Sequence, residues 1–331
     1  MVVLDQRDVD RKVLEILKIL NRSAEPIGAR AIARELKDVG IELTERAVRY
    51  HLQIMDERGL TYQVGREGRL ITEAGRDEVG AALVTDKVGY VIGRIKLLAF
   101  QTTFEPARQE GGVVMNTALF KRSEFDKALD AMAGAFKAGI TVSERVGITQ
   151  PGDRIGGTLV PEDRIGFSTV CSVTINGVLL KAGIPMDSRF GGILEVHGRH
   201  PHRFVEIIHY SGSSLDPSEA FIRAHMTDVG AAVRTGNGRV LANFRELPGP
   251  CRPLVEETAA QLRAAGISGL LQMGEMGEPV CQIPVDLNMC GVILLGGLNP
   301  VAAAAEAGIE ADYHAMSTVV DFASLRSVWS L

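Results

Sequence analysis

Residues 169–185 hold a thiol, several hydroxyls and an amide close together, and such groups can bind a small polar ligand. If this segment is a strand, its alternation gives one apolar face with a thiol and a second face of hydrogen-bonding groups. The first face carries Cys171, Val173 and Ile175, and the second carries Ser172, Thr174 and Asn176.

An arginine next to two glycines follows this segment, as Arg189, Gly191 and Gly192. A guanidinium fork together with exposed backbone N–H groups is a combination that binds carboxylates. The pattern therefore favours a carboxylate site. A strand, a turn and a structural salt bridge would use the same residues, and this alternative stays open.

A hydroxyl-rich segment runs from Tyr210 to Ser214 and is followed by Asp216, Pro217 and Glu219. Asp216 and Glu219 have the spacing of a capping box, and Pro217 suits the first helical position. We expect a short helix there. The hydroxyls before it could hold an anion or belong to an ordinary capped loop.

The remaining reactive side chains give little support for catalysis or metal binding. His197, His200 and His202 lie close together, but no Cys, Asp or Glu interleaves them at ligand spacing, so we expect an exposed hairpin tip and no metal. The four cysteines include no C-x-x-C pair, which is typical of reduced thiols. Neither a Ser/His/Asp order nor a carboxylate pair stands out, and we expect no enzyme activity.

A second set of side chains could read DNA. Val48, Leu52 and Met55 recur at helical spacing after Thr44, which is a suitable N-cap residue. The opposite face of this helix carries arginine, tyrosine and glutamine side chains, and arginine and glutamine pair with guanine and adenine edges in the major groove. The candidate DNA-binding residues are Thr44, Arg46, Arg49, Tyr50, Gln53, Arg66 and Arg69.

These DNA-reading candidates fall within residues 1–84, which the pattern divides into helices and one hairpin. We expect helices near residues 9–20, 31–36 (closed by Gly40) and 44–58, a strand pair within 61–71, and a helix from Thr72 through Leu83. This order predicts a winged helix-turn-helix. The segment has 14 Lys+Arg against 15 Asp+Glu, so a winged helix that docks proteins is the alternative.

Residues 85–331 are rich in glycine and in strand-like runs, with two clear helices. Ser123 and Asp126 predict a capping box for a helix that ends at Gly139, and Pro253 begins a helix that ends at Gly266. The two helices have matching flanks at an offset of 127 residues, which indicates an internal duplication with repeats of about 85–210 and 211–331. The fold class we expect is α/β (α+β) and multidomain, with a ligand cleft between the duplicated halves.

Charge and hydropathy exclude two other classes of protein. The net charge of −5 excludes a protein that coats nucleic acid by bulk charge. Residues 287–305 are uncharged, but asparagines, glycines and a proline interrupt them, so we expect a buried strand, a turn and a helix instead of a membrane span. The first ten residues alternate in charge and do not resemble a secretory signal. We expect a cytoplasmic location.

The segment from Cys171 through Gly192, with residues 210–217 and the N-terminal winged helix, resembles the NrpR family of nitrogen-regulatory repressors. The resemblance implies repression of nitrogen-fixation and ammonia-assimilation genes, dimeric binding to palindromic operator DNA, and release by 2-oxoglutarate. It also implies one effector domain, no cofactor, and a partner such as a second regulator or a basal transcription factor. Within the matching segments, chemistry selects the effector-binding candidates Cys171, Ser172, Thr174, Asn176, Arg189 and Tyr210.

Two other functional classes fit the sequence less well. One is a bifunctional enzyme–regulator that converts a small carboxylate, and the other is an adaptor whose winged helix binds protein instead of DNA. Product formation from 2-oxo acids would identify the first, and DNA retention that does not depend on Arg49 would identify the second.

Overall fold

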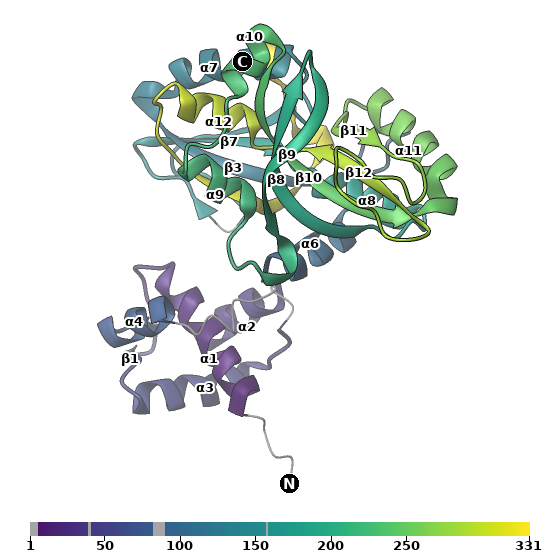
Figure 1. Cartoon of the computed structure of the whole chain (residues 1–331). Coiled ribbons are helices and arrows are strands. Elements are labelled where there is room, and N and C mark those ends of the chain that lie inside the picture. Colours follow the sequence, from purple (N-terminus) through teal and green to yellow (C-terminus); the bar gives the residue numbers. More distant parts are fainter. Residues whose placement is uncertain (1–5, 39–40, 82–89, 157) are drawn as a thin grey trace. The chain divides into compact units, whose positions relative to one another are not determined.

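The computed structural model describes residues 6–38, 41–81, 90–156 and 158–331 (Figure 1). The chain divides into two compact units, Met1–Lys87 and Val88–Leu331.

The first unit is a winged helix, as the sequence predicts. Its elements are α1 (Gln6–Asn21), α2 (Ala29–Asp38), α3 (Glu45–Glu57), β1 (Thr61–Val64), β2 (Gly68–Ile71) and α4 (Glu73–Ala81). One apolar stripe from each of the first three helices meets in a single buried core, to which β2 adds Ile71. Ile27 bridges to Arg69, which adds a third short segment to the wing. The predicted end at Gly40 and the extension to Leu83 lie outside the described residues.

Local capping explains where α3 and α4 begin. The Thr44 side chain accepts a hydrogen bond from the Ala47 N–H over 3.2 Å, so the predicted N-cap is confirmed. The Thr72 hydroxyl accepts one from the Gly75 N–H over 3.0 Å. These bonds satisfy backbone donors that the first helical turn leaves unpaired.

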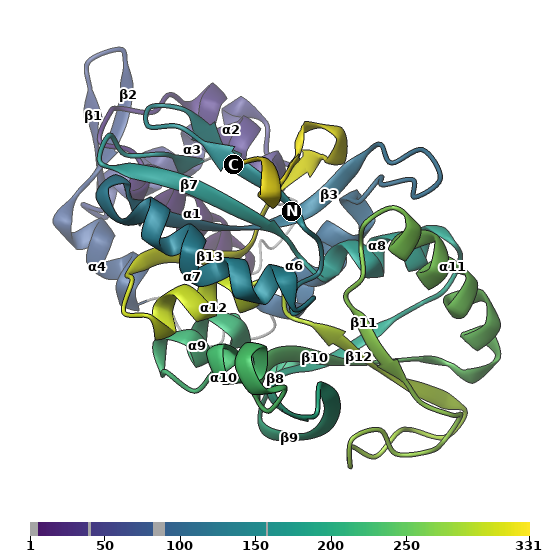
Figure 2. The same ribbon diagram turned by 90° about the horizontal axis from the view of Figure 1, so that it is seen from above.

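The second unit contains two antiparallel five-stranded sheets (Figures 1 and 2). The order in one is β13 (Ala311–Asp321), β3 (Gly112–Lys121), β7 (Arg164–Val170), β4 (Arg145–Thr149) and β14 (Arg326–Ser327). The order in the other is β11 (Leu270–Met273), β12 (Met289–Leu295), β10 (Gly238–Pro248), β8 (Asp187–His197) and β9 (His200–His209). A small separate pair joins β5 (Arg154–Ile155) to β6 (Thr158–Leu159).

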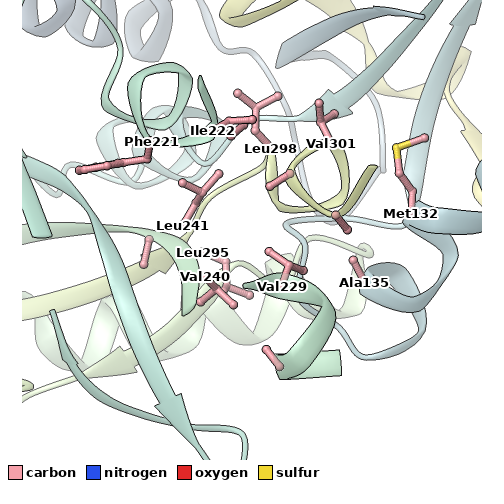
Figure 3. Packing of buried hydrophobic residues seen from close by; sticks show 14 of the residues in the cluster. Met132, Ala135, Phe221, Ile222, Val229, Val240, Leu241, Leu295, Leu298 and Val301 are labelled. Carbon is pink, nitrogen blue, oxygen red and sulfur yellow. The ribbon is translucent and has the colours of Figure 1, made fainter. Parts of the chain in front are cut away.

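The helices of this unit pack on and between the sheets. They are α6 (Tyr90–Gln101), α7 (Phe125–Lys137), α8 (Val173–Lys181), α9 (Pro217–Arg223), α10 (Val229–Thr235), α11 (Arg252–Ala264) and α12 (Asn299–Glu306). The largest core joins both halves, since Met132 and Ala135 of α7 share it with residues of α10, β10, β12 and α12 (Figure 3). Apolar residues of α8 and α11, two helices that Figure 2 shows at the same end of this unit, share a second core with residues of β3 and β12. The predicted α/β class is confirmed.

The same order of elements occurs twice along the second unit. The series β3, α7, β4, β7, α8 is followed by β10, α11, β11, β12, α12. Each series then contributes one strand to the sheet of the other. Strand β8 follows α8 in the first series but pairs with β10 of the second, and β13 follows α12 in the second series but pairs with β3 of the first. This exchange of strands means that neither half closes its own sheet. The repeat boundaries near residue 210 stay a prediction.

Three local expectations were wrong. The capping box of Asp216 and Glu219 is incomplete, because Asp216 accepts the Ser218 N–H while Glu219 accepts the Ala315 N–H of β13. Residues 173–181 form helix α8 instead of a strand. This helix is buried on nearly every side, and a Cβ at its Gly177 would lie 2.2 Å from Thr102 Cβ. A buried helix lacks a polar face, so its short sequence could be mistaken for strand alternation. The capping box of Ser123 and Asp126 does not form, because a 3-10 turn (Arg122–Glu124) precedes α7 and leaves its N-cap without a side-chain bond.

The expected glycine and proline boundaries are confirmed. Gly139 and Gly266 follow α7 and α11 with φ of 70° and 85°, a region that favours glycine. Pro253 lies in the first turn of α11. The uncharged residues 287–305 form β12, a turn and α12. Over the described ranges, no helix combines the length and the apolar composition that crossing a bilayer requires.

Candidate effector pocket and DNA-facing surface

A pocket opens between the two series of strands. The cavity itself has a volume of about 20 Å³, and the space reaches about 320 Å³ when the open solvent at its mouth is included. Its walls come from β3, β10, β13, α6 and the turns that precede α8, α9 and α12. The polar lining groups are Asn116, Ser172, Tyr210, Asp216, Ser218, Asn243 and Arg245. Ligand sites commonly combine an apolar wall with a few converging polar groups.

Arg245 is the cation of this pocket and is only 1% exposed. Its Nη1 donates to Ser188 Oγ over 3.2 Å and its Nη2 donates to Ser172 Oγ over 3.3 Å. Its Nε has no hydrogen-bond partner in the described part of the chain, and no carboxylate there lies within salt-bridge distance. Burial lowers the pKa of Arg245, while the nearby Tyr210, Cys171 and Asp216 oppose that shift. A buried cation without a counterion is costly, and such groups are concentrated at functional sites.

Neutral donors surround this cation. Ser172 Oγ accepts hydrogen bonds from Arg245 and from Asn243 Nδ2, the latter over 3.2 Å. The Ser172 hydroxyl also interacts with the neighbouring Cys171 thiol, and its hydrogen can turn from that sulfur to a ligand. The Tyr210 hydroxyl donates to Asn243 Oδ1. Burial raises the pKa of Tyr210, so it stays a protonated donor.

Two further groups define the electrostatics of the pocket. Burial raises the pKa of the Cys171 thiol to about 11, so it stays neutral near pH 7. Burial, followed by the charge of Glu219, raises the pKa of Asp216 to about 6, although hydrogen bonds from Ser218 oppose this. Asp216 also caps α9 by accepting the Ser218 N–H over 2.8 Å. The pocket therefore holds a permanent cation and a carboxyl group that titrates near neutrality.

The pocket is built from equivalent positions of the two halves. Asn116 on β3 and Asn243 on β10 lie 127 residues apart, and both line it. The backbones approach closely there, since a Cβ at Gly297 would lie 2.3 Å from the Val170 carbonyl oxygen. The position equivalent to Arg245 is Ala118. One half alone therefore supplies the charge, which suits one anionic group per chain.

The DNA-facing candidates are on α3 and on the turn between β1 and β2. Thr44, Arg46, Tyr50, Gln53 and Arg66 are exposed. Arg49 is also exposed and pairs with Glu45 one helical turn earlier, over 2.5 Å. Arg69 differs from the others, because its side chain is only 18% exposed and its Nε lies 2.8 Å from Asp56 Oδ2. The ion pair of Arg69 with Asp56 therefore joins strand β2 of the wing to helix α3.

Known proteins resemble both units. The family model described as NrpR regulatory domains NRD1 and 2 matches residues 88–327, and that of the ribonuclease R winged-helix domain matches residues 14–79. The global nitrogen regulator NrpRI of Methanosarcina mazei is 38% identical, over 97% of this chain and 98% of the relative. The chain belongs to the NrpR family of nitrogen regulators.

Two other members extend the comparison. The global nitrogen regulator NrpR of Methanococcus maripaludis is 33% identical over 95% of this chain and 54% of its own length. The crystal structure of a nitrogen repressor-like protein from Methanococcus jannaschii has a TM-score of 0.62 and 32% identity, and the match covers 72% of this chain and 98% of that one. The NrpR resemblance inferred from the sequence is thus confirmed at the level of the family.

The six effector candidates in this NrpR-family chain divide into two groups. Cys171, Ser172 and Tyr210 line the pocket. Thr174 is buried and bonds the Val114 backbone, and Asn176 donates to Ser188 behind the pocket.

Arg189 also lies away from the pocket lining, as the extra residue of a register irregularity between β8 and β10. Its guanidinium forms ion pairs with Asp187, Glu246 and Asp286 at 3.2–3.4 Å. Partial burial lowers its pKa, but these carboxylates raise it overall. Its charge is therefore already balanced.

Asn116, Asp216, Asn243 and Arg245 are pocket residues that were not singled out as binding residues from the sequence. Residues 240–247 of β10 are all buried, so Arg245 interrupts a run that is otherwise mostly apolar. A charged residue in a buried strand is unusual. This feature of the sequence is what could have indicated that Arg245 is a binding residue. In the described residues, no cluster of three or more His, Cys, Asp or Glu side chains is placed to hold a metal.

Proposed function

We propose that this chain is a cytoplasmic transcriptional repressor of nitrogen-assimilation or nitrogen-fixation genes. It binds palindromic operator DNA as a homodimer, and 2-oxoglutarate releases it. The observation that carries this proposal is Arg245, a buried cation to which the described part of the chain offers no carboxylate partner, in a pocket of neutral donors within an NrpR-family chain. A second regulator or a basal transcription factor is a further partner of the repressor.

The pocket suits the chemistry of a 2-oxo dicarboxylate. Such a ligand carries two negative charges and a ketone, so it needs one strong cationic contact and several neutral donors. Arg245 supplies the cation, with its Nε and part of each Nη still available. The Ser172 hydroxyl and the amide of an asparagine such as Asn116 supply the neutral contacts. We assign the cationic contact to Arg245 in place of Arg189, whose charge three carboxylates balance.

The winged helix supplies the DNA contacts in this proposal. Arg46, Arg49 and Gln53 lie on the exposed face of α3, where arginine reads guanine and glutamine reads adenine. Arg66 lies in the turn of the wing, a position that meets phosphate or the minor groove. A dimer doubles these contacts, which compensates for the nearly neutral charge of the unit.

Release requires that 2-oxoglutarate prefer the form of the protein that binds DNA poorly. A ligand with equal affinity for both forms would shift nothing. A coupling free energy of about 1–3 kcal/mol would change the operator affinity roughly 5- to 150-fold.

The test is calorimetric titration of the full chain with 2-oxoglutarate, with glutamate as the control, followed by operator binding with and without ligand. We expect 2-oxoglutarate to bind and to weaken binding to DNA of dyad symmetry, and glutamate to do neither. Absence of 2-oxoglutarate binding would refute the effector assignment.

The near-neutral charge of the first unit favours an adaptor as the second candidate. DNA retention that is the same in Arg49→Ala, with a transcription factor that copurifies, would support the adaptor. An enzyme acting on the same ligand has less support, because the raised pKa of Cys171 keeps its thiol un-ionised.

A further inference from the structure

Strand β13 contains a bulge at residues 315–317, where its pairing with β3 shifts between His314 and Thr318. Met316, at the centre of the bulge, has φ of +51° and is 3% exposed. A non-glycine residue with this backbone conformation is strained and persists only when its surroundings hold it. The bulge is therefore a local structure maintained by its contacts.

Side chains from three different elements hold this bulge. Glu219 of α9 accepts the Ala315 N–H over 2.8 Å, and Asn116 of β3 accepts the Met316 N–H over 3.1 Å. Arg94 of α6 donates to the Met316 carbonyl from Nε at 2.9 Å and from Nη2 at 2.6 Å. Two donors of one guanidinium thus converge on one carbonyl oxygen, which restricts the position of α6 relative to β13.

The same groups border the effector pocket. Ala315, Met316 and Asn116 line it, and so does Ile95, the residue next to Arg94. A ligand oxygen that accepts from Asn116 Nδ2 competes with Thr169 Oγ1, which accepts from that nitrogen over 3.3 Å, and can turn the amide whose Oδ1 holds the Met316 N–H. A ligand that displaces the Met316 side chain moves its peptide groups. Either event changes the acceptor to which Arg94 is bound.

Helix α6 connects this pocket wall to the DNA-binding unit along the chain. Among the described residues it is the first helix of the second unit, and residues 82–89 separate it in sequence from α4 of the winged helix. Helix α6 also packs against α8. Gly177 of α8 lies against Thr102, the residue that follows the end of α6. A shift of α6 against β13 would therefore move the part of the second unit that lies closest along the chain to the winged helix.

We propose that Arg94 is the positioning residue that couples occupancy of the effector pocket to helix α6, through the strained bulge at Met316. This inference rests on the proposed function, since it assumes that the pocket takes 2-oxoglutarate. Two arrangements of the bulge, one bonded to Arg94 and one not, form the two-state element that such a response needs.

The test compares Arg94→Met, Arg94→Lys and the control Arg108→Met in the full chain. Arg108 is an arginine of the same unit, 69% exposed and paired with Glu105 and Glu110 outside the pocket lining. We measure 2-oxoglutarate affinity by calorimetry and operator affinity with and without 2-oxoglutarate. Arg94→Met should still bind 2-oxoglutarate, while the ratio of operator affinities without and with ligand falls toward one. Arg94→Lys, which keeps one donor, should respond to an intermediate degree, and Arg108→Met should respond like the unsubstituted chain.

Each other outcome has a defined meaning. An unsubstituted chain that does not bind 2-oxoglutarate refutes the proposed function itself. If it responds and Arg94→Met responds equally, only the coupling role of Arg94 is refuted. Loss of 2-oxoglutarate binding in Arg94→Met would also overturn that role, because Arg94 would then be a binding residue.

Hydrogen exchange on the unsubstituted chain keeps the inference testable if Arg94→Met does not fold. We expect added 2-oxoglutarate to change exchange in peptides that cover residues 311–321 and in those that cover residues 90–101. A change confined to 311–321 would show that the bulge responds without α6, and the coupling would be refuted.

Discussion

Ser172 accepts a hydrogen bond from Arg245 Nη2 over 3.3 Å, and the two residues come from different halves of the duplicated unit. Ser172 follows β7 of the first series, and Arg245 lies on β10 of the second. Ala118 occupies the position 127 residues before Arg245, so Arg245 is the cation among the lining residues of the pocket. The order of elements repeats along this unit, and its two series together supply the walls of the pocket.

Arg245→Met should abolish most effector binding while the chain stays folded. A charge-assisted hydrogen bond contributes about 1.5–3 kcal/mol, so the 2-oxoglutarate affinity should fall roughly 10- to 150-fold. Replacing a buried unpaired cation by an apolar side chain of similar length removes a desolvation cost, so the melting temperature should not fall. Calorimetry and thermal unfolding check the two parts.

Arg189→Met is the matched control for this substitution. Arg189 is an arginine on the adjacent strand, outside the pocket lining and 39% exposed at its side chain. Its loss should leave 2-oxoglutarate affinity within about twofold, because its guanidinium lies outside the pocket lining, while the loss of its pair with the buried Glu246 should lower stability. If Arg189→Met lowered the 2-oxoglutarate affinity and Arg245→Met did not, the contact with the anion would belong to Arg189, as the sequence predicts.

Effector affinity should rise as the pH falls through about 6. A bound anion disfavours the ionised form of Asp216, whose pKa is already raised to about 6, so the complex holds this proton more tightly than the free protein. Binding then takes up a proton and strengthens at lower pH. A further rise of one pKa unit on binding would give about a tenfold difference across the titration.

Titration calorimetry between pH 5.5 and 8 measures this dependence, with Asp216→Asn as the control. Asparagine can still accept the Ser218 N–H at the start of α9, so the helix should keep its cap. The variant should bind with little dependence on pH. A dependence that persists in Asp216→Asn would point to the other titratable groups near this pocket, of which Glu219 is the nearest acid.

The winged helix could be predicted from the sequence because its periodicity and caps are local. Thr44, Thr72 and the Val48–Leu52–Met55 stripe define elements without reference to the rest of the chain. Helix α8 could not be recognised in this way. Its burial comes from α6, α11 and β3, which are far away in sequence, and that burial removes the amphipathic pattern on which recognition depends.

The pocket could be predicted only in part, for a different physical reason. Cys171, Ser172 and Tyr210 were identified by residue type, but the cation was assigned to Arg189. The irregularity between Phe244 and Arg245 shifts the register of β8 against β10, so Ser188 pairs with Arg245 and Arg189 is the extra residue. A bulge changes which side chains face inward, and nothing in simple alternation marks its place. The strand exchange between halves is likewise a long-range feature.

The two arginines of the wing should behave differently when each is replaced by alanine. Arg66→Ala removes an exposed cation from the turn and should weaken DNA binding similarly on all sequences, with the salt slope reduced by about one phosphate contact. Arg69→Ala breaks the partly buried pair with Asp56 and should instead lower the unfolding free energy of the winged helix by about 1 kcal/mol. DNA titrations at several salt concentrations and urea unfolding separate the effects. Equal salt slopes for Arg66→Ala and the unsubstituted chain would remove Arg66 from the DNA contacts.

Two glycines provide a test of the close contact between the halves. A Cβ at Gly297 would lie 2.3 Å from the Val170 carbonyl oxygen and 2.5 Å from Asn116 Nδ2, so Gly297→Ala forces these elements apart. Overpacking of this kind typically costs about 1–3 kcal/mol, and we expect a lower melting temperature together with weaker 2-oxoglutarate binding.

Gly93, within α6, has open space at its Cβ position. Gly93→Ala should therefore stabilise the chain by about 0.5–1 kcal/mol. A melting temperature of Gly297→Ala that is unchanged or raised would contradict the packing described at Gly297, and a lowered one for Gly93→Ala would contradict the open space at Gly93.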